Sequence, residues 1–166
     1  MQEVSALCDR IVVIADGRRL EDAARSHCVF DGEARELKLG VAPGLSEWQL
    51  KERVKIWYQG EAKRLFAERM DLYAERLGVR YTSMTLSSAG TRWGSCTVGG
   101  NIRLNWRLVH FSLPLIDYVV AHELAHLLEM NHSPRFWAQV GSVYPDYDGA
   151  RAALRRRSQE LPVLFD

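Results

Sequence analysis

The chain has 166 residues, of which 47% are hydrophobic and 26% charged, and its formal net charge is +1 at pH 7. This length favours a single domain with a real core, and the charge argues neither for a generally basic nucleic-acid-binding protein nor for an acidic one. No apolar run approaches the roughly 18 residues that span a bilayer, and MQEVSALCDR lacks the pattern of a signal peptide. Three widely spaced cysteines (Cys8, Cys28 and Cys96) fit a reduced compartment, so we expect a cytoplasmic protein without a membrane partner.

The first part of the chain, residues 1–44, predicts a strand-rich segment that packs on the same domain as residues 45–166. IVVI at 11–14 is typical of a short buried strand, and the turn signal Asp16-Gly17 follows it. After a second turn signal, Asp31-Gly32, apolar residues alternate along residues 37–41, which favours a half-buried strand.

A helical pattern follows. Ser46 is placed to cap its start, the pattern continues to Leu77, and Gly78 is placed to end it. Gly60 predicts a break. Apolar residues at spacings of three and four predict a stripe that packs in the core. The stripe consists of Trp48, Val54, Trp57, Tyr58, Leu65, Phe66, Met70, Tyr73, Ala74 and Leu77.

Short strands are expected over residues 79–109, and Gly99-Gly100 predicts a hairpin within RWGSCTVGGNIRLN. Pro114 then opens a helix that reads LPLIDYVVAHELAHLLEM and extends to Met130. A final helix is predicted from Ser133-Pro134, and the charged tail is expected to be helical in part.

The stretch HELAHLLEMNH contains three of the five histidines. On a helix, His122 and His126 lie on one face, about 40° apart, so both imidazoles can reach one ion. Zinc takes neutral imidazole nitrogens at about 2.0–2.1 Å. Glu123 is turned about 100° from His122, which places it to reach a bound water rather than the ion.

His132 is the predicted third ligand. In a continued helix it would lie about 15 Å along the axis from His122, out of reach of the same ion. Asn131 can end the helix in the left-handed conformation, and Ser133-Pro134 can start another, so the chain can fold back at His132.

Glu129 leaves an alternative open. It lies three residues after His126 on the same helical face, where it is either an acceptor for a ligand imidazole or the third ligand in place of His132. We favour His132, because a carboxylate on the next turn of a straight helix is too far along the axis.

Three ligands, an open fourth position and a nearby base are typical of a catalytic site, whereas a structural zinc usually takes four protein ligands. The residues therefore predict one Zn²⁺ per chain and hydrolysis by an activated water, with Glu123 as general base. A peptide bond is the most natural substrate.

Several blocks of sequence resemble the YgjP-like metallopeptidase family, which is related to the SprT and WLM zinc-protease-like domains. The matching blocks are RWGSC (92–96), NIRLNWRL (101–108), PLIDYVVAHELAHL (114–127), NHSPRFW (131–137) and PDY (145–147). The resemblance, which covers residues 45–157, implies an α+β, zincin-like fold with a small mixed sheet packed on helices that include the HExxH helix. It also implies that His122, His126 and His132 bind zinc and that Glu123 is the base. Glu129 stands where metzincins have glycine, which argues against assignment to that group.

The resemblance further implies an edge strand that pairs with an extended peptide or protein substrate, and the hairpin around RWGSC is our candidate. Arg92 is expected either to hold a carboxylate or phosphate or to pair with an acid, and Trp93 and Phe136 to pack. An oxyanion donor is expected among Tyr144, Tyr147, His110 and Asn105. The tentative substrate-contacting residues are Arg92, Trp93, Gly94, Ser95, Cys96 and Asn105.

Two rival functions remain open. One is a metal-dependent nucleotide pyrophosphatase, a label that members of the family also carry, although the chain has no Gly-rich phosphate loop. The other is a nucleic-acid-associated protease like the SprT-like relatives, in which the tail arginines would bind nucleic acid. Arginine clusters of this kind are more often solvated faces of helices. These arginines are Arg151, Arg155, Arg156 and Arg157. The sequence leaves the oligomeric state open.

Overall fold

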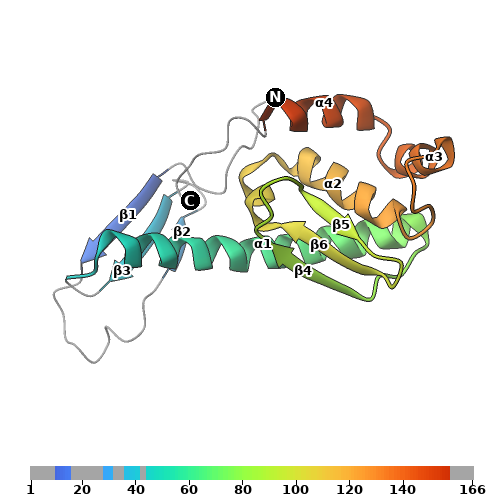
Figure 1. The fold of residues 1–166 in the computed structure, drawn as a ribbon. Helices are drawn as coiled ribbons and strands as arrows, with labels where there is room; N and C mark the ends of the chain where they lie inside the picture. Colours follow the sequence, from blue (N-terminus) through green and yellow to red (C-terminus); the bar gives the residue numbers. More distant parts are fainter. Residues whose placement is uncertain (1–9, 16–27, 32–35, 42–43, 158–166) are drawn as a thin grey trace.

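The computed structural model describes residues 10–15, 28–31, 36–41 and 44–157. Two three-stranded sheets lie towards opposite ends of one long helix, and three shorter helices gather around the second sheet (Figure 1). In chain order the elements are β1 (Arg10–Ala15), β2 (Cys28–Asp31), β3 (Glu36–Val41), α1 (Glu47–Leu77), β4 (Ser83–Ser87), β5 (Gly94–Cys96), β6 (Asn101–Asn105), the 3-10 helix η1 (Trp106–His110), α2 (Leu113–Ala125), α3 (Pro134–Val143) and α4 (Tyr147–Arg157). Within these described parts, no helix combines the length and apolar character needed to cross a membrane.

The first sheet has the order β1-β3-β2, with β3 parallel to β1 and antiparallel to β2. The strands predicted at residues 11–14 and 37–41 are confirmed as β1 and β3. The turn signal Asp16-Gly17 and the glycine of Asp31-Gly32 lie outside the described residues.

Both predicted ends of α1 are confirmed. The Ser46 hydroxyl accepts from the Gln49 N–H at 3.3 Å, and the Gln49 side chain accepts from the Ser46 N–H at 2.9 Å, which forms a capping box. Gly78 ends the helix with φ +65°, a conformation that L side chains rarely adopt.

The predicted break at Gly60 is wrong, because α1 runs through it without interruption. A mid-helix glycine costs about 1 kcal/mol relative to alanine, which burial of the flanking Tyr58 and Ala62 offsets. The core prediction is also wrong for Trp48, which is 69% exposed. The other predicted stripe residues are buried or partly buried against the core.

The second sheet has the order β4-β6-β5, with the central strand β6 parallel to β4 and antiparallel to β5. The predicted hairpin is confirmed: the Gly100 N–H donates to the Thr97 carbonyl at 2.9 Å, and Gly100 has φ +76°. Ile102 and Leu104 on β6 are fully buried and face the core.

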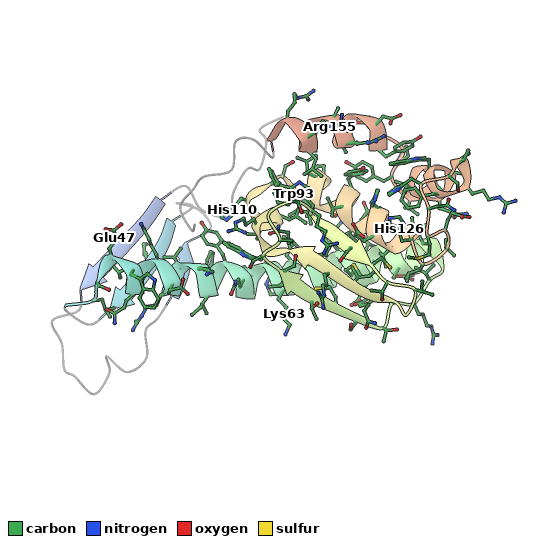
Figure 2. All side chains as sticks on the ribbon, in the orientation of Figure 1. Glu47, Lys63, Trp93, His110, His126 and Arg155 are labelled. Carbon is green, nitrogen blue, oxygen red and sulfur yellow. The ribbon has the colours of Figure 1, made fainter. Side chains whose placement is uncertain are left out.

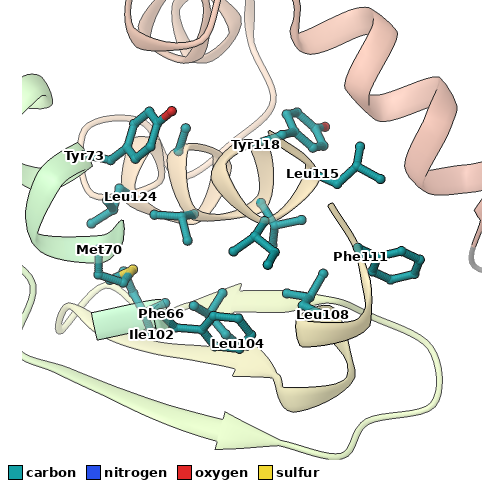
Figure 3. Packing of buried hydrophobic residues seen from close by; sticks show 14 of the residues in the cluster. Phe66, Met70, Tyr73, Ile102, Leu104, Leu108, Phe111, Leu115, Tyr118 and Leu124 are labelled. Atoms are coloured by element: carbon teal, nitrogen blue, oxygen red, sulfur yellow. The ribbon is translucent and has the colours of Figure 1, made fainter. Parts of the chain in front are cut away.

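The main core lies between this sheet and helix α2, with α1 closing one side (Figure 3). Arg69 of α1 and Asp117 of α2 form a bidentate ion pair, with N–O distances of 2.6 and 2.8 Å. The core side chains labelled in Figure 3 are Phe66, Met70, Tyr73, Ile102, Leu104, Leu108, Phe111, Leu115, Tyr118 and Leu124.

Helix α2 starts as predicted, with Pro114 in its first turn, but it ends at Ala125 rather than at Met130. The last turn tightens, since the Leu127 N–H donates to Leu124 and the Leu128 N–H to Ala125, both at 3.0 Å. The chain therefore leaves the helix axis at His126 instead of at Asn131. Helix α3 begins at Pro134 after the Ser133 cap, as predicted, and α4 accounts for the helical part of the tail.

Candidate metal centre and active site

Three histidines converge beyond the end of α2. Each offers one nitrogen, and these atoms all lie within 4.8 Å of one another. His122 and His126 come from the last turn and cap of α2, and His132 comes from the loop before α3. The Nε2 atoms of His122 and His132 are 3.1 Å apart, close to the roughly 3.3 Å that separates two nitrogens bound to one tetrahedral zinc.

The loop that carries His132 is held at both sides by short hydrogen bonds. The Ser133 N–H donates to the Asn131 side chain at 3.1 Å, and the Ser133 hydroxyl accepts from the Phe136 N–H at 3.3 Å. The start of α3 thereby fixes the place of His132. Asn131 contributes through this turn and not by ending α2.

Phe136 forms the apolar back wall of the cluster. It is fully buried, and its ring centroid lies 4.9, 4.5 and 4.7 Å from those of His122, His126 and His132. The expectation that Phe136 packs is met, with the imidazoles themselves as its neighbours. The residue therefore excludes water behind the site and restricts all three rings.

Trp137 links the cluster to α4. Its ring stacks at 29° on His132 and at 20° on Tyr147, with centroid distances of 5.8 and 5.1 Å. The Arg151 guanidinium lies 5.1 Å from the centroid of Trp137. One arginine of the predicted basic cluster therefore faces an aromatic ring beside the site.

The environment of His122 and His126 favours the neutral imidazole that metal binding requires. Burial, and then the neighbouring His126 and His132, lower the pKa of His122 to about 3. Burial also lowers the pKa of His126, whose Nδ1 lies 3.2 Å from the Glu129 carbonyl and donates to it. That bond leaves Nε2 of His126 free to accept a metal. The donor set fits a divalent ion such as zinc.

Glu129 enters this site through its backbone and not through its carboxylate. Its carbonyl orients His126, while its carboxylate is not part of the cluster that His122, His126 and His132 form. Its carboxylate would share a helical face with His122 and His126 only if α2 continued to Met130. Helix α2 ends at Ala125.

Glu123 lies on α2 against strand β5. It is 6% exposed, and burial raises the pKa of its carboxyl to about 8, an effect that Arg92 opposes. Gly94 makes this approach possible: a Cβ on Gly94 would lie 2.6 Å from Cγ and Cδ of Glu123. Only glycine gives the carboxyl group this space.

The segment 92–96 divides between two faces. Gly94 faces Glu123, and Cys96 does the same, since burial and then Glu123 raise the pKa of its thiol to about 11. Ser95 alternates to the opposite face, where it pairs with Arg103. Strand β5 is an edge of its sheet.

Asn105 is buried and organises the loop that leads into β5. Its amide donates to the carbonyls of Ala89 at 2.7 Å and Arg92 at 3.3 Å, and its N–H donates to the Trp93 carbonyl at 2.8 Å. Asn105 therefore supports the segment from behind instead of facing a substrate.

A cavity of about 230 Å³ opens beside Glu123 and His122. Trp93 contributes to its wall and also packs edge-on against Phe111 at 5.0 Å, so it combines packing with cavity lining. The sequence prediction missed Tyr118, although its spacing of four before His122 places it on the same helical face. The cavity is lined by Arg92, Trp93, Gly94, Tyr118, Val119, His122, Glu123 and Leu154.

The proposed oxyanion donors are not gathered at this cavity. His110 precedes α2 and contacts Tyr58, at the opposite end of the helix from His126 (Figure 2). Tyr144 lies 6.0 Å from Tyr118 between ring centroids, and Tyr147 is stacked on Trp137. Neither tyrosine lines the cavity that Glu123 and His122 share.

An α+β fold with a histidine cluster and a buried glutamate at the end of one helix is characteristic of metallopeptidases. Residues 11–157 match the family described as YgjP-like, metallopeptidase domain, so the chain belongs to this family and is a metallopeptidase. The family match begins earlier than the motifs at 45–157 indicated. Among solved structures, the chain resembles the metallopeptidase zymogen of Pyrococcus abyssi abylysin at 22% identity and a TM-score of 0.51, over 58% of this chain and 94% of that one. No curated protein matches the chain.

The sequence-based family, fold class and enzyme class are confirmed by these matches. The family match reaches as far as a metallopeptidase, and the structure groups three histidines that could hold a metal ion.

Proposed function

We propose that this metallopeptidase is a zinc enzyme in which His122, His126 and His132 bind the ion and Glu123 is the general base. The observation that supports this most directly is the convergence of three imidazole nitrogens within 4.8 Å, beside a carboxyl group 6% exposed. Three nitrogen ligands leave a fourth position open, as catalytic zinc sites do.

The ion, when bound, supplies a Lewis acid and lowers the pKa of a bound water to about 7. Glu123 accepts the proton of the attacking water as the water oxygen bonds to the peptide carbonyl carbon. It then delivers this proton to the nitrogen, and the C–N bond breaks. Burial raises the pKa of Glu123 to about 8, which suits delivery of a proton to the leaving nitrogen, and Arg92 opposes this shift.

Strand β5 is the proposed docking edge for an extended substrate. Among the described strands it pairs with β6 alone, and its Gly94 lies directly against Glu123. A peptide added to this edge would place its main chain along the carboxyl group, and recognition would rely on backbone groups.

The test combines metal content with hydrolysis. Purified protein is analysed by mass spectrometry for bound metal, beside His126→Ala and the matched control His110→Gln, whose histidine lies at the far end of α2. We expect about one zinc per chain, lost in His126→Ala and kept in the control. A His126→Ala variant that retains full zinc would contradict the ligand assignment.

The role of Glu123 is tested separately with Glu123→Gln, assayed on peptides and on nucleoside triphosphates. We expect zinc content to be unchanged and peptide hydrolysis to fall by at least about 100-fold. Because Arg92 and Arg151 both act electrostatically on this site, an anionic nucleotide remains the second candidate substrate. Turnover of nucleotides alone, abolished by Glu123→Gln, would replace the peptidase assignment with the pyrophosphatase.

A further inference from the structure

We propose that the cavity beside Glu123 and His122 binds a substrate residue next to the scissile bond and selects a carboxylate through Arg92. This inference rests on the proposed peptidase function and adds the chemistry of its substrate. The carboxylate is either an acidic side chain or the carboxyl terminus of the peptide, since both present the same group.

The position of the cavity follows from its lining. Glu123 and His122 form one wall and Gly94 of the edge strand another, so the cavity adjoins both the proposed base and the proposed docking edge. A peptide paired with β5 would direct alternate side chains towards α2. A side chain that flanks the reacting bond would then enter this space.

The cavity has an apolar body. Trp93 contributes from the loop before β5, Val119 from α2 and Leu154 from α4, and α4 closes the side remote from the sheet. Figure 2 shows Trp93 on the side of the sheet towards α4, which carries the labelled Arg155. Its volume of about 230 Å³ is sufficient for the methylene groups and carboxylate of a glutamate.

Arg92 gives the cavity its charge. Its guanidinium is exposed, and none of the described carboxylates lies within ion-pair distance of it. Arg92 lines the cavity together with Glu123, and its charge opposes the rise in the pKa of that carboxyl group that burial causes. Because Asn105 holds the Arg92 carbonyl at 3.3 Å, the backbone that carries this arginine is fixed before a ligand arrives.

Arg151 adds to the same potential from the α4 side. It lies on α4, three residues before the cavity-lining Leu154, and its guanidinium rests over Trp137. A ligand carboxylate would therefore be attracted from two sides, and Arg92 is the one of the two that lines the cavity itself. A guanidinium and a carboxylate form charge-assisted hydrogen bonds that are stronger than neutral ones.

The test first maps cleavage sites in a peptide mixture and then uses synthetic pairs. One pair carries Glu or Gln at the residue beside the cleaved bond, and a second pair ends there in a free carboxylate or an amide. We expect the zinc-loaded wild type to favour the carboxylate member of at least one pair by about five- to tenfold in kcat/KM. The responding pair identifies the source of the carboxylate.

Arg92→Gln should remove this preference. Arg103→Gln is the matched control, because Arg103 is an exposed arginine of the same sheet that pairs with Ser95 on the face away from Glu123. The preference of Arg103→Gln for the carboxylate peptide should equal that of the wild type. A preference that survives in Arg92→Gln, or is absent in the wild type, would overturn the inference and leave the peptidase function intact.

A binding measurement keeps the test independent of turnover. Titration calorimetry on Glu123→Gln with the same peptide pairs should show tighter binding of the carboxylate member, lost when Arg92→Gln is added. Equal affinities would overturn the inference. Absence of any peptide cleavage by the zinc-loaded wild type would instead count against the proposed function.

Discussion

Replacing Gly94 by alanine tests whether strand β5 sets the position of the proposed base. The added Cβ would lie 2.6 Å from Cγ and Cδ of Glu123, whereas carbon atoms in contact are separated by about 3.5 Å. One of the two groups must therefore move by about 0.9 Å. Because β5 is bonded to β6, we expect the movement to fall largely on the Glu123 side chain.

A displacement of this size has a defined cost. Misplacement of a reacting group by about 1 Å can lower the rate about 100-fold. We therefore expect kcat/KM of Gly94→Ala on a cleaved peptide to fall about 100-fold, with zinc content unchanged. Overpacking should also reduce the free energy of unfolding by about 1–3 kcal/mol. Peptide hydrolysis, metal analysis and urea denaturation measure the three quantities.

Gly90→Ala is the matched control, because a Cβ there would meet no atom within 4 Å and the substitution leaves β5 unchanged. It should keep wild-type activity and stability. Wild-type kcat/KM in Gly94→Ala would refute the reasoning, since the carboxyl position would then have no influence on the reaction. Loss of zinc in Gly94→Ala would also refute it, by assigning the effect to the metal site.

Two predictions concern stability. Asp117→Ala removes one partner of the part-buried Arg69 ion pair and should lower the free energy of unfolding by about 3 kcal/mol, measured by urea denaturation. The control Arg64→Ala removes exposed ion pairs and should change this free energy by less than about 1 kcal/mol. Equal losses in the two variants would contradict the importance of burial. His110 has a pKa lowered to about 4 by burial and then by Arg107, so below pH 6.5 the unfolded state takes up a proton that the folded state does not. Stability should fall by up to about 3 kcal/mol between pH 6.5 and 4, and His110→Phe should lose this part of the slope; an unchanged slope would show that the folded state binds the proton.

The positions of the two helical histidines could be predicted because they depend on local geometry. His122 and His126 share a face wherever the chain is helical, and the signals at Ser133 and Pro134 are short-range caps. The structure brings His132 to the other two because these caps start a new helix one residue later. Local rules of this kind are readable from one sequence.

The end of α2 and the exposure of Trp48 could not be predicted from the same rules. Leu127, Leu128 and Glu129 all favour helix, yet the turn after Ala125 tightens, and the Glu129 carbonyl accepts from the His126 ring. Trp48 continues an apolar stripe in the sequence, but the core formed by β4, β6 and α2 lies along the later part of α1. Both errors arise where tertiary contacts outweigh local pattern.

The cavity depends on contacts that no local pattern contains. Leu154 comes from α4, Tyr118 from α2 and Trp93 from the loop before β5, and the spacing between them in sequence carries no periodic signal. Helix α4 is held by its packing on α2, where Ala150 and Leu154 are buried, and by the ring contacts from His132 through Trp137 to Tyr147. The element that closes the cavity therefore rests on a ring that also stacks on a proposed metal ligand. It follows that metal binding and the shape of the cavity share the same support, and a change at Trp137 would reach both.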